Sequence, residues 1–294
     1  MTRRIIALLL IPILVTALFS CTWRDTEDDT ATPPTRVAVL FSSLCEVWLN
    51  AGGSIGVTVG ESIERGLVPE GTPLVDEGAG KTINTELLLA ARPDLVVYSP
   101  DIPAQVSAAA LCEAAGIDTL PLRVETFTDY VEAIRTAAAI TKNPDAVAAA
   151  EAMGHEIETL KSNCPDASPR VLFVRAGSTA SSTKAKQSAD HFAAAMLTEL
   201  GCRNIADEVS LLVDTLSTEA ILAADPDHIL FSLMGDEAAA RANIESLLSR
   251  PEWQALRAVK AGNVTVLPRD LFHYKPCGRY VRAYEFLADA LYKE

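Results

Sequence analysis

The feature that most constrains the fold is a pattern that occurs twice, at residues 85–99 and 218–232. Each copy has a Thr-Glu start, an apolar helical face, a Pro-Asp break and an apolar run of strand length. A short helix that leads into a buried strand is therefore predicted in both halves. Arg-led apolar runs at residues 36–41 and 170–175 lie at nearly the same offset. Self-similarity over about half the chain predicts two similar α/β lobes rather than a solenoid.

The composition is that of a globular protein with room for two domains. The chain has 294 residues, of which 49% are hydrophobic and 22% are charged. A chain of this length can bury one core in each lobe, and this composition excludes disorder as a general description.

The first residues are typical of a bacterial lipoprotein signal. Arg3 and Arg4 precede an apolar stretch at residues 5–18, and a small residue precedes Cys21. We expect residues 1–20 to be removed and Cys21 to carry the lipid. The alternative is an uncleaved membrane anchor, but the apolar run is shorter than the roughly 20 residues that a spanning helix needs.

A polar, acidic stretch follows, and we interpret residues 21–35 as a flexible tether between the lipid and the folded part. The formal net charge of the chain is −14, and loss of Arg3 and Arg4 makes it more negative. Such acidity argues against nucleic acid and anionic membrane surfaces as partners. It favours an extracytoplasmic protein that docks on cationic surfaces.

The two copies of the repeat are separated by a predicted long helix. Asn143 is expected to cap it, and Pro144 suits its first turn. Roughly 18 residues at 1.5 Å each span about 27 Å, the width of a lobe. Residues 143–162 are therefore predicted to join an N-terminal lobe at 36–142 to a C-terminal lobe at 163–294, as a stiff rod rather than a hinge.

Ligands of open α/β sheets bind outside the carboxyl ends of the strands. The loops at those ends carry apolar rings and a few cations, which suit a large, anionic, partly aromatic ligand. The alternative for each residue is that it packs in the core or lies on the solvated surface. Trp48 in particular could be a core anchor. Phe272, Lys186 and Lys275 share these loops, and the candidate ligand-binding residues are Ser43, Cys45, Trp48, Tyr98, Arg175, Lys184, Phe231, His273, Tyr274 and Arg279.

Glu86 and Glu219 occupy equivalent helix starts in the two copies. Thr85 is expected to cap the first of these helices. Duplicated lobes should present the two carboxylates on a common exposed face. The plainer interpretation is that each carboxylate stabilises its helix start by about 0.3–1 kcal/mol. The two interpretations are compatible.

Residues 85–97, the predicted rod at 144–161 and the segment 251–264 together resemble the substrate-binding proteins of ABC importers for iron-siderophores, haem and cobalamin. The resemblance runs from about residue 36 to the C-terminus. It implies two α/β lobes whose central sheets are flanked by helices, one rigid interlobe helix, and a ligand cleft between the lobes.

The resemblance also implies a monomeric, non-enzymatic receptor with no intrinsic cofactor. One glutamate on each lobe would dock to arginines of a dimeric ABC permease, and Glu86 and Glu219 match those positions. The implied cargo is a ferric siderophore or haem, with cobalamin as the alternative, carried by a protein anchored to the cell membrane through Cys21.

Cys45 and Cys277 depart from the small or amide residues expected in such loops. They could contact a metal centre, bridge the closed cleft, or be small packing residues. With Cys21 lipidated, an odd number of cysteines remains, namely Cys45, Cys112, Cys164, Cys202 and Cys277. Cys164 with Cys202 is a candidate disulfide, although the sequence alone does not define the pairing.

Three other classes of function compete with a chelate receptor. An enzyme has little support, because the four histidines lack HExxH spacing and GxSxG is absent; only a Cys-His pair of Cys45 or Cys277 with His273 is conceivable. A bare zinc or manganese receptor needs about three His and a carboxylate, whereas only His191 and His273 lie in suitable loops. The third is a sensory lipoprotein that transports nothing.

Overall fold

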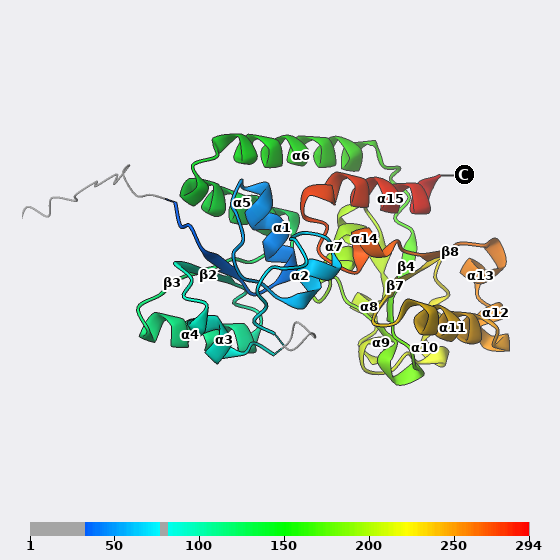
Figure 1. Cartoon of the computed structure of the whole chain (residues 1–294). Coiled ribbons are helices and arrows are strands. Elements are labelled where there is room, and N and C mark those ends of the chain that lie inside the picture. Colours follow the sequence, from blue (N-terminus) through cyan, green and yellow to red (C-terminus); the bar gives the residue numbers. More distant parts are fainter. Residues whose placement is uncertain (1–32, 77–81, 294) are drawn as a thin grey trace, which may run out of the picture. The chain divides into compact units, whose positions relative to one another are not determined.

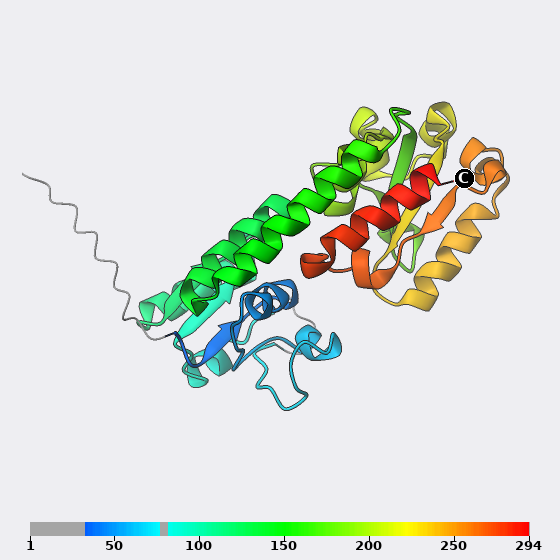
Figure 2. The same cartoon turned by 90° about the horizontal axis from the view of Figure 1, so that it is seen from above.

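The computed structural model describes residues 33–76 and 82–293, shown in Figures 1 and 2. The predicted signal, Cys21 and most of the predicted tether lie outside these residues. Residues from Pro33 onward form one compact unit. In the described part of the chain, no helix has the length and hydropathy needed to cross a membrane.

The N-terminal half is built on a parallel sheet in the order β1-β2-β3. Alternate residues of β1 enter different cores: Val37 and Val39 pack with α1 and α5, whereas Ala38 packs with α3 and α4. This alternation is what a strand covered on both faces requires. The strands are β1 (Val37–Val39), β2 (Leu95–Tyr98) and β3 (Asp118–Pro121), and the helices are α1 (Ser42–Asn50), α2 (Gly60–Glu64), α3 (Thr85–Ala90), α4 (Pro103–Ala114) and α5 (Phe127–Thr141).

The C-terminal half has a sheet in the order β5-β4-β7-β8, with β6 beside β4, and only β5 is antiparallel to its neighbour. Its strands are β4 (Arg170–Ala176), β5 (Lys184–Ala185), β6 (Arg203–Asn204), β7 (His228–Leu233) and β8 (Val264–Val266). Its helices are α7 (Phe192–Glu199), α8 (Ile205–Glu208), α9 (Leu211–Asp214), α10 (Thr218–Ala224), α11 (Glu237–Leu248), α12 (Pro251–Gln254), α13 (Arg257–Ala261), α14 (Arg269–Phe272) and α15 (Tyr280–Tyr292), with 3₁₀ turns η1 (Ala180–Ser182) and η2 (Cys277–Arg279).

The structure confirms the predicted two-lobe α/β fold and shows what the repeat does. The order β4-β7-β8 repeats β1-β2-β3, all parallel. Asp94 accepts a hydrogen bond from the backbone N–H of Arg36 at 2.9 Å, and Asp227 accepts the same bond from Arg170 at 2.9 Å. Each Pro-Asp pair thus joins the start of one strand to the start of its neighbour. Hydrogen bonds from Thr35 and Arg36 lower the pKa of Asp94.

The predicted long helix is α6 (Pro144–Asn163), with 20 residues. It packs against α5 at one end and α15 at the other, on one side of the two lobes (Figures 1 and 2). Asn143 is its N-cap residue, but the Asn143 side chain makes no capping hydrogen bond. Proline at the first helical turn therefore defines the helix start.

The segment after α14 joins the two halves a second time. The turn η2 packs against α1, and the ring of Tyr280 lies 5.3 Å from that of Phe127 and 5.7 Å from that of Tyr130. One apolar core consequently runs from β1, α1 and α5 into α7 and α15. The predicted C-terminal lobe is therefore not self-contained, because part of it packs on the N-terminal lobe.

All five cysteines of the described residues are free thiols. The candidate disulfide between Cys164 and Cys202 is therefore not formed in this structure.

Candidate functional site

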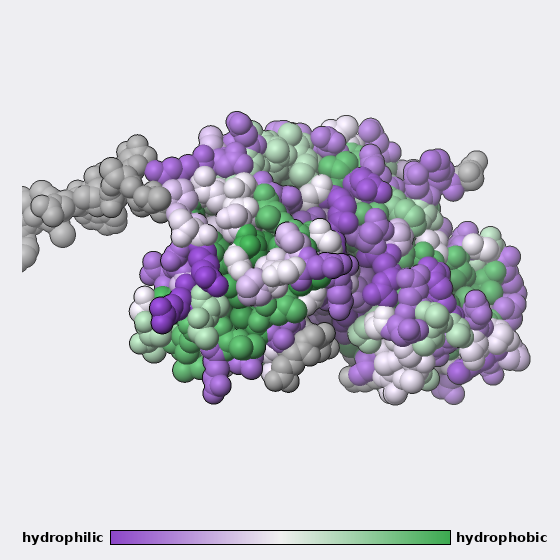
Figure 3. Space-filling view, viewed as in Figure 1, coloured by the Kyte–Doolittle hydropathy of each residue, from purple (hydrophilic) through white to green (hydrophobic). Residues whose placement is uncertain are grey.

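A cleft of about 760 Å³ lies between the lobes, at the carboxyl ends of β1, β2, β4 and β7. Its N-terminal wall is mainly apolar, and its C-terminal wall carries cations and histidines. In Figure 3 the surface is likewise more hydrophobic on the N-terminal side and more hydrophilic on the C-terminal side. The lining residues are Phe41, Ser43, Val59, Glu61, Ile102, Pro103 and Ala104 on one wall and Arg175, Asp190, His191, Phe192, Met234, Gly235, His273, Tyr274 and Lys275 on the other.

Arg175 and Lys275 carry positive charge on the C-terminal wall, beside one carboxylate, Asp190. Arg175 is the second-to-last residue of β4 and is half-buried, and burial lowers the pKa of its guanidinium. Within residues 33–76 and 82–293, no hydrogen bond or ion pair is made by its side chain. Lys275 differs, because its Nζ lies 2.5 Å from Glu125 and 5.0 Å from the ring centre of Phe192. Among the described lining residues, Arg175 is therefore the cation whose side chain has no partner.

His273 is held with one ring nitrogen available. Its Nδ1 lies 2.8 Å from the carbonyl oxygen of Leu233. A carbonyl can only accept, so Nδ1 carries the proton and Nε2 keeps its lone pair. Burial, the largest effect, lowers the pKa of His273 and favours the neutral ring. Neutral imidazole anchored through its other nitrogen is the form in which histidine binds metals.

His191 is neutral for a different reason. Its Nδ1 accepts the backbone N–H of Ala193 at 3.2 Å and so caps α7, while its ring packs 4.9 Å from Phe173 and 4.7 Å from Phe192. Burial and then the nearby cations lower its pKa to about 3. The proton of the neutral ring therefore lies on Nε2, which makes His191 a hydrogen-bond donor rather than a metal ligand.

This burial predicts a pH-dependent stability. In the unfolded chain, His191 becomes protonated below about pH 6.5. In the folded protein it stays neutral down to its pKa of about 3. The free energy of unfolding should therefore fall as pH drops from 6.5, by at most roughly 1.4 kcal/mol per pH unit for this residue. His191→Asn keeps a capping side chain and should flatten the dependence between pH 6.5 and 5, measured by urea unfolding. His155→Asn, at an exposed site, should not; equal slopes in both variants would contradict the assignment.

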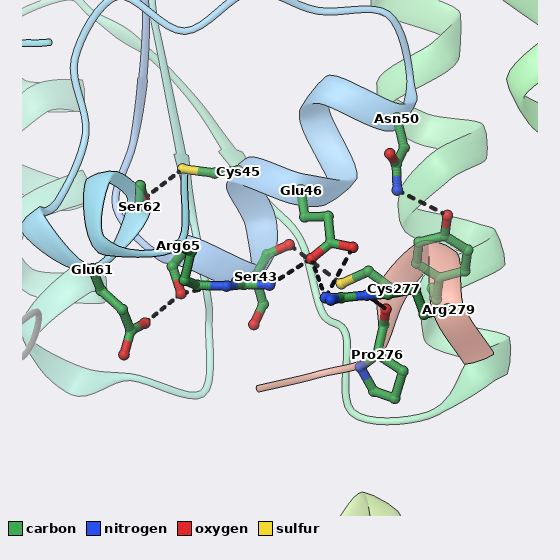
Figure 4. Close-up of polar contacts among 12 residues, drawn as sticks. Ser43, Cys45, Glu46, Asn50, Glu61, Ser62, Arg65, Pro276, Cys277 and Arg279 are labelled. Atoms are coloured by element: carbon green, nitrogen blue, oxygen red, sulfur yellow. Dashed lines mark hydrogen bonds and ion pairs between the residues drawn. The ribbon is translucent and has the colours of Figure 1, made fainter. Parts of the chain in front are cut away.

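The ring of Tyr274 lies against a cluster of charged residues, and Figure 4 shows the members of that cluster, Glu46, Arg65 and Arg279. The guanidinium of Arg65 lies 4.4 Å from the ring centre of Tyr274, and Arg65 is paired with Glu46 at 2.5 Å. Glu46 also pairs with Arg279 at 3.1 Å. The Arg65 and Glu46 side chains are 6% and 12% exposed. This cluster links α1 and α2 to η2 and supports one wall of the cleft from behind.

Neither cysteine of interest faces the cleft. The thiol of Cys45 lies 3.0 Å from the Thr58 hydroxyl and 3.1 Å from that of Ser62, and the thiol of Cys277 donates to the carbonyl of Ser43 at 3.5 Å. Both side chains are fully buried, and burial raises the pKa of both thiols. They are packing residues, and neither lines the cleft beside His273.

The structure brings part of the predicted site together. Ser43, Arg175, His273 and Tyr274 line the cleft as expected, as do Lys275 and His191.

The other predicted ligand-binding residues do not line the cleft. Trp48 is buried in α1 with its Nε1 bonded to the carbonyl of Ser54 at 3.0 Å, and Phe231 is buried inside the C-terminal core. Tyr98 packs on the core around α4, and Arg279 is engaged by Glu46. Lys184 lines a separate pocket, because the chain reverses at η1 and returns along the edge of the sheet as β5.

The lining also includes residues that the sequence did not single out. Met234 directly follows β7, Phe41 lies two residues after β1, and residues 102–104 lie shortly after β2. The carboxyl-end rule alone would have found them. Glu61 was not predictable in this way, because it lies on the short helix α2.

Glu86 and Glu219 are both exposed, each at the second position of its helix. The N-cap of α3 is Asn84, whose side chain accepts the Glu86 and Leu87 amides, so the prediction of Thr85 as the cap is wrong. Ser217 is the equivalent cap of α10. Figure 1 shows α3 and α10 on the same side of the two lobes, opposite α6.

In the described segments, no three His, Cys, Asp or Glu side chains converge in a way that could hold an ion.

Comparison with known proteins adds to this geometry. Residues 37–271 match the model of a family described as periplasmic binding protein. No curated protein sequence matches the chain.

Solved structures share the fold at low sequence identity. The haem-binding protein RhuT of Roseiflexus has a TM-score of 0.71 at 18% identity, with 87% of this chain and 97% of RhuT covered. The vitamin B12 binding protein BtuF of Vibrio cholerae has 0.70 at 19%, with 88% and 97% covered. SirA of Staphylococcus aureus, solved with staphyloferrin B, has 0.64 at 20%, with 88% and 92% covered.

Proposed function

The chain belongs to the periplasmic binding protein family, and from this premise we propose that it captures an anionic metal chelate outside the cytoplasm and delivers it to an ABC permease. Members of this family are binding proteins rather than enzymes. The observation that carries the proposal is Arg175, a half-buried cation in the cleft that pairs with no described residue. A charge in such a place is stabilised by an opposite charge, which a bound ligand supplies.

The cleft suits a ligand that has an apolar side and an anionic side. Phe41, Ile102 and Pro103 offer an apolar wall, and Arg175 and Lys275 face it with positive charge. A ferric siderophore or haem has apolar or aromatic surface together with carboxylate or catecholate groups. A volume of about 760 Å³ suits a molecule of this size.

His273 supports a ligand that contains a metal. Its free Nε2 in the cleft can coordinate an ion whose remaining positions are filled by a chelator. Structures of similar fold are described as haem-binding, B12-binding and siderophore-bound proteins. We place a ferric siderophore or haem first because the cationic wall favours anions; cobalamin, whose charges largely cancel, is the second candidate.

A bare zinc or manganese ion is a weaker candidate. It needs several protein ligands at one point, and the described residues offer no such cluster. A sensory lipoprotein without transport is distinguished by the docking variants described in the Discussion.

Delivery is proposed to use Glu86 and Glu219 on the face opposite α6. Both are exposed, at equivalent helix starts of the two lobes. The lipid on Cys21 would hold the receptor at the membrane, and the protein is proposed to act as a monomer.

The experiment that tests this function is a calorimetric titration of residues 22–294 with haemin, ferric siderophores, cobalamin and free zinc, together with visible absorbance. The described tryptophans Trp48 and Trp253 are each 1% exposed, so calorimetry reports binding in the cleft more directly than fluorescence does. We expect at least one chelate to bind more tightly than about 10 μM, roughly −7 kcal/mol. Weaker binding of every chelate, or tight stoichiometric binding of zinc alone, would refute the ligand class.

A further inference from the structure

A second pocket, of about 420 Å³, lies in the C-terminal lobe between η1, the residues around the start of α10, and α11. Its described lining residues include none that line the cleft. The polar groups that point to its chemistry belong to Ser181, Lys184, Thr218 and Arg250.

The pocket has an unusual charge for this protein. The chain carries 39 acidic and 25 basic residues, yet the described lining contains two cations and no carboxylate. Among the described residues, neither the Lys184 nor the Arg250 side chain has a hydrogen-bond or ion-pair partner. Two like charges beside one hollow repel each other, and a bound anion would relieve that repulsion.

The loop that carries Lys184 is held in place by its own hydrogen bonds. Asn243 donates to the carbonyl of Gly177 at 2.9 Å and to the hydroxyl of Thr183 at 2.8 Å. Thr179 and Ser182 cap η1 reciprocally. Gly177 is required here, because a Cβ would collide with the Ser182 side chain. The pocket is thus formed before any ligand arrives, which lowers the entropy cost of binding.

We propose that this pocket is a binding site for an oxyanion group, either a carboxylate or a phosphate, separate from the chelate cleft. Arginine presents a planar fork that matches such groups, lysine adds a mobile positive charge, and the hydroxyls of Ser181 and Thr218 can donate further hydrogen bonds. Two sources can supply the group. One is a small free anion, and the other is an acidic side chain of a protein docked on the adjoining face, because Thr218 directly precedes Glu219.

The first test uses inorganic phosphate and citrate on the ligand-free Arg175→Ala protein, so that this cation of the cleft does not contribute. Calorimetry and the side-chain ¹⁵N signals of Arg250 should show saturable binding that weakens with added salt. Adding Lys184→Ala with Arg250→Ala should reduce the affinity at least tenfold. The matched control is Lys260→Ala with Arg282→Ala, at exposed positions outside the pocket, which should bind as before. No saturation by about 10 mM, or equal binding by both double variants, overturns the site.

The second test identifies the source and rests on the proposed function. Lys184→Ala with Arg250→Ala is introduced into the otherwise wild-type receptor in cells. If uptake falls while the cleft affinity is unchanged, the group comes from the docked partner. If uptake is unchanged although phosphate binding is lost, the group is a free anion. Because the first test needs no chelate, failure of the proposed cargo would not affect it.

Discussion

Reversing both exposed glutamates, Glu86→Lys together with Glu219→Lys, is expected to reduce uptake of the cargo roughly a hundredfold or more. If each carboxylate docks on permease arginines, the lysines convert two attractions into repulsions, and like charges in contact cost several kcal/mol. Both residues are exposed, and neither lines the cleft. The dissociation constant of the chelate should therefore stay within about twofold, as mutations at separated sites act independently.

A matched control separates docking from the overall change in charge. Glu156→Lys with Glu285→Lys makes the same charge change at exposed positions on α6 and α15, on the side opposite α3 and α10 (Figure 1). Uptake by this control should equal that of the wild type. Normal uptake by the Glu86 and Glu219 double variant would instead favour a lipoprotein that does not deliver cargo through this face.

Arg175→Ala is expected to weaken binding of an anionic chelate by about tenfold to a hundredfold, corresponding to the roughly 1.5–3 kcal/mol of a hydrogen bond to a charged group. The side chain has no partner among the described residues, so its removal breaks no ion pair there. The melting temperature of the empty protein should accordingly be unchanged or slightly raised, because a half-buried cation is lost. Calorimetry measures the first effect and thermal unfolding the second.

Lys184→Ala is the control for Arg175→Ala, since it removes a positive charge outside the cleft. It should leave chelate affinity within about twofold. Equal binding by wild type and Arg175→Ala would show that the ligand does not meet this cation. A neutral cargo such as cobalamin would then become the better candidate.

The general architecture could be predicted from the sequence because each copy of the repeat specifies both local elements and a contact between neighbouring strands. Each copy contains a helix start, a strand and an aspartate, and those aspartates, Asp94 and Asp227, bond to the strands led by Arg36 and Arg170. Strand order follows from such contacts. The interlobe helix was predictable because Pro144 and an uninterrupted helical composition define it locally.

The site was predicted only in part, since its loops were identified but not the directions of their side chains. Trp48 and Phe231 lie in the right elements but face the core, where apolar burial is most favourable. The pairing of Glu46 with Arg279 joins residues separated by 233 positions, and no local pattern indicates it. The second connection between the lobes, through η2, was missed for the same reason.

The central claim is that the chelate binds between the two lobes, and amide hydrogen exchange tests it most directly. Exchange is compared with and without a saturating amount of the chelate that binds most tightly in the calorimetric titration. We predict protection on both walls together, at residues 41–43 and 102–104 and at residues 234–235 and 273–275. The other large hollow, between α6 and α15, should exchange as before. Protection confined to one lobe, or to the hollow between α6 and α15, would contradict the account.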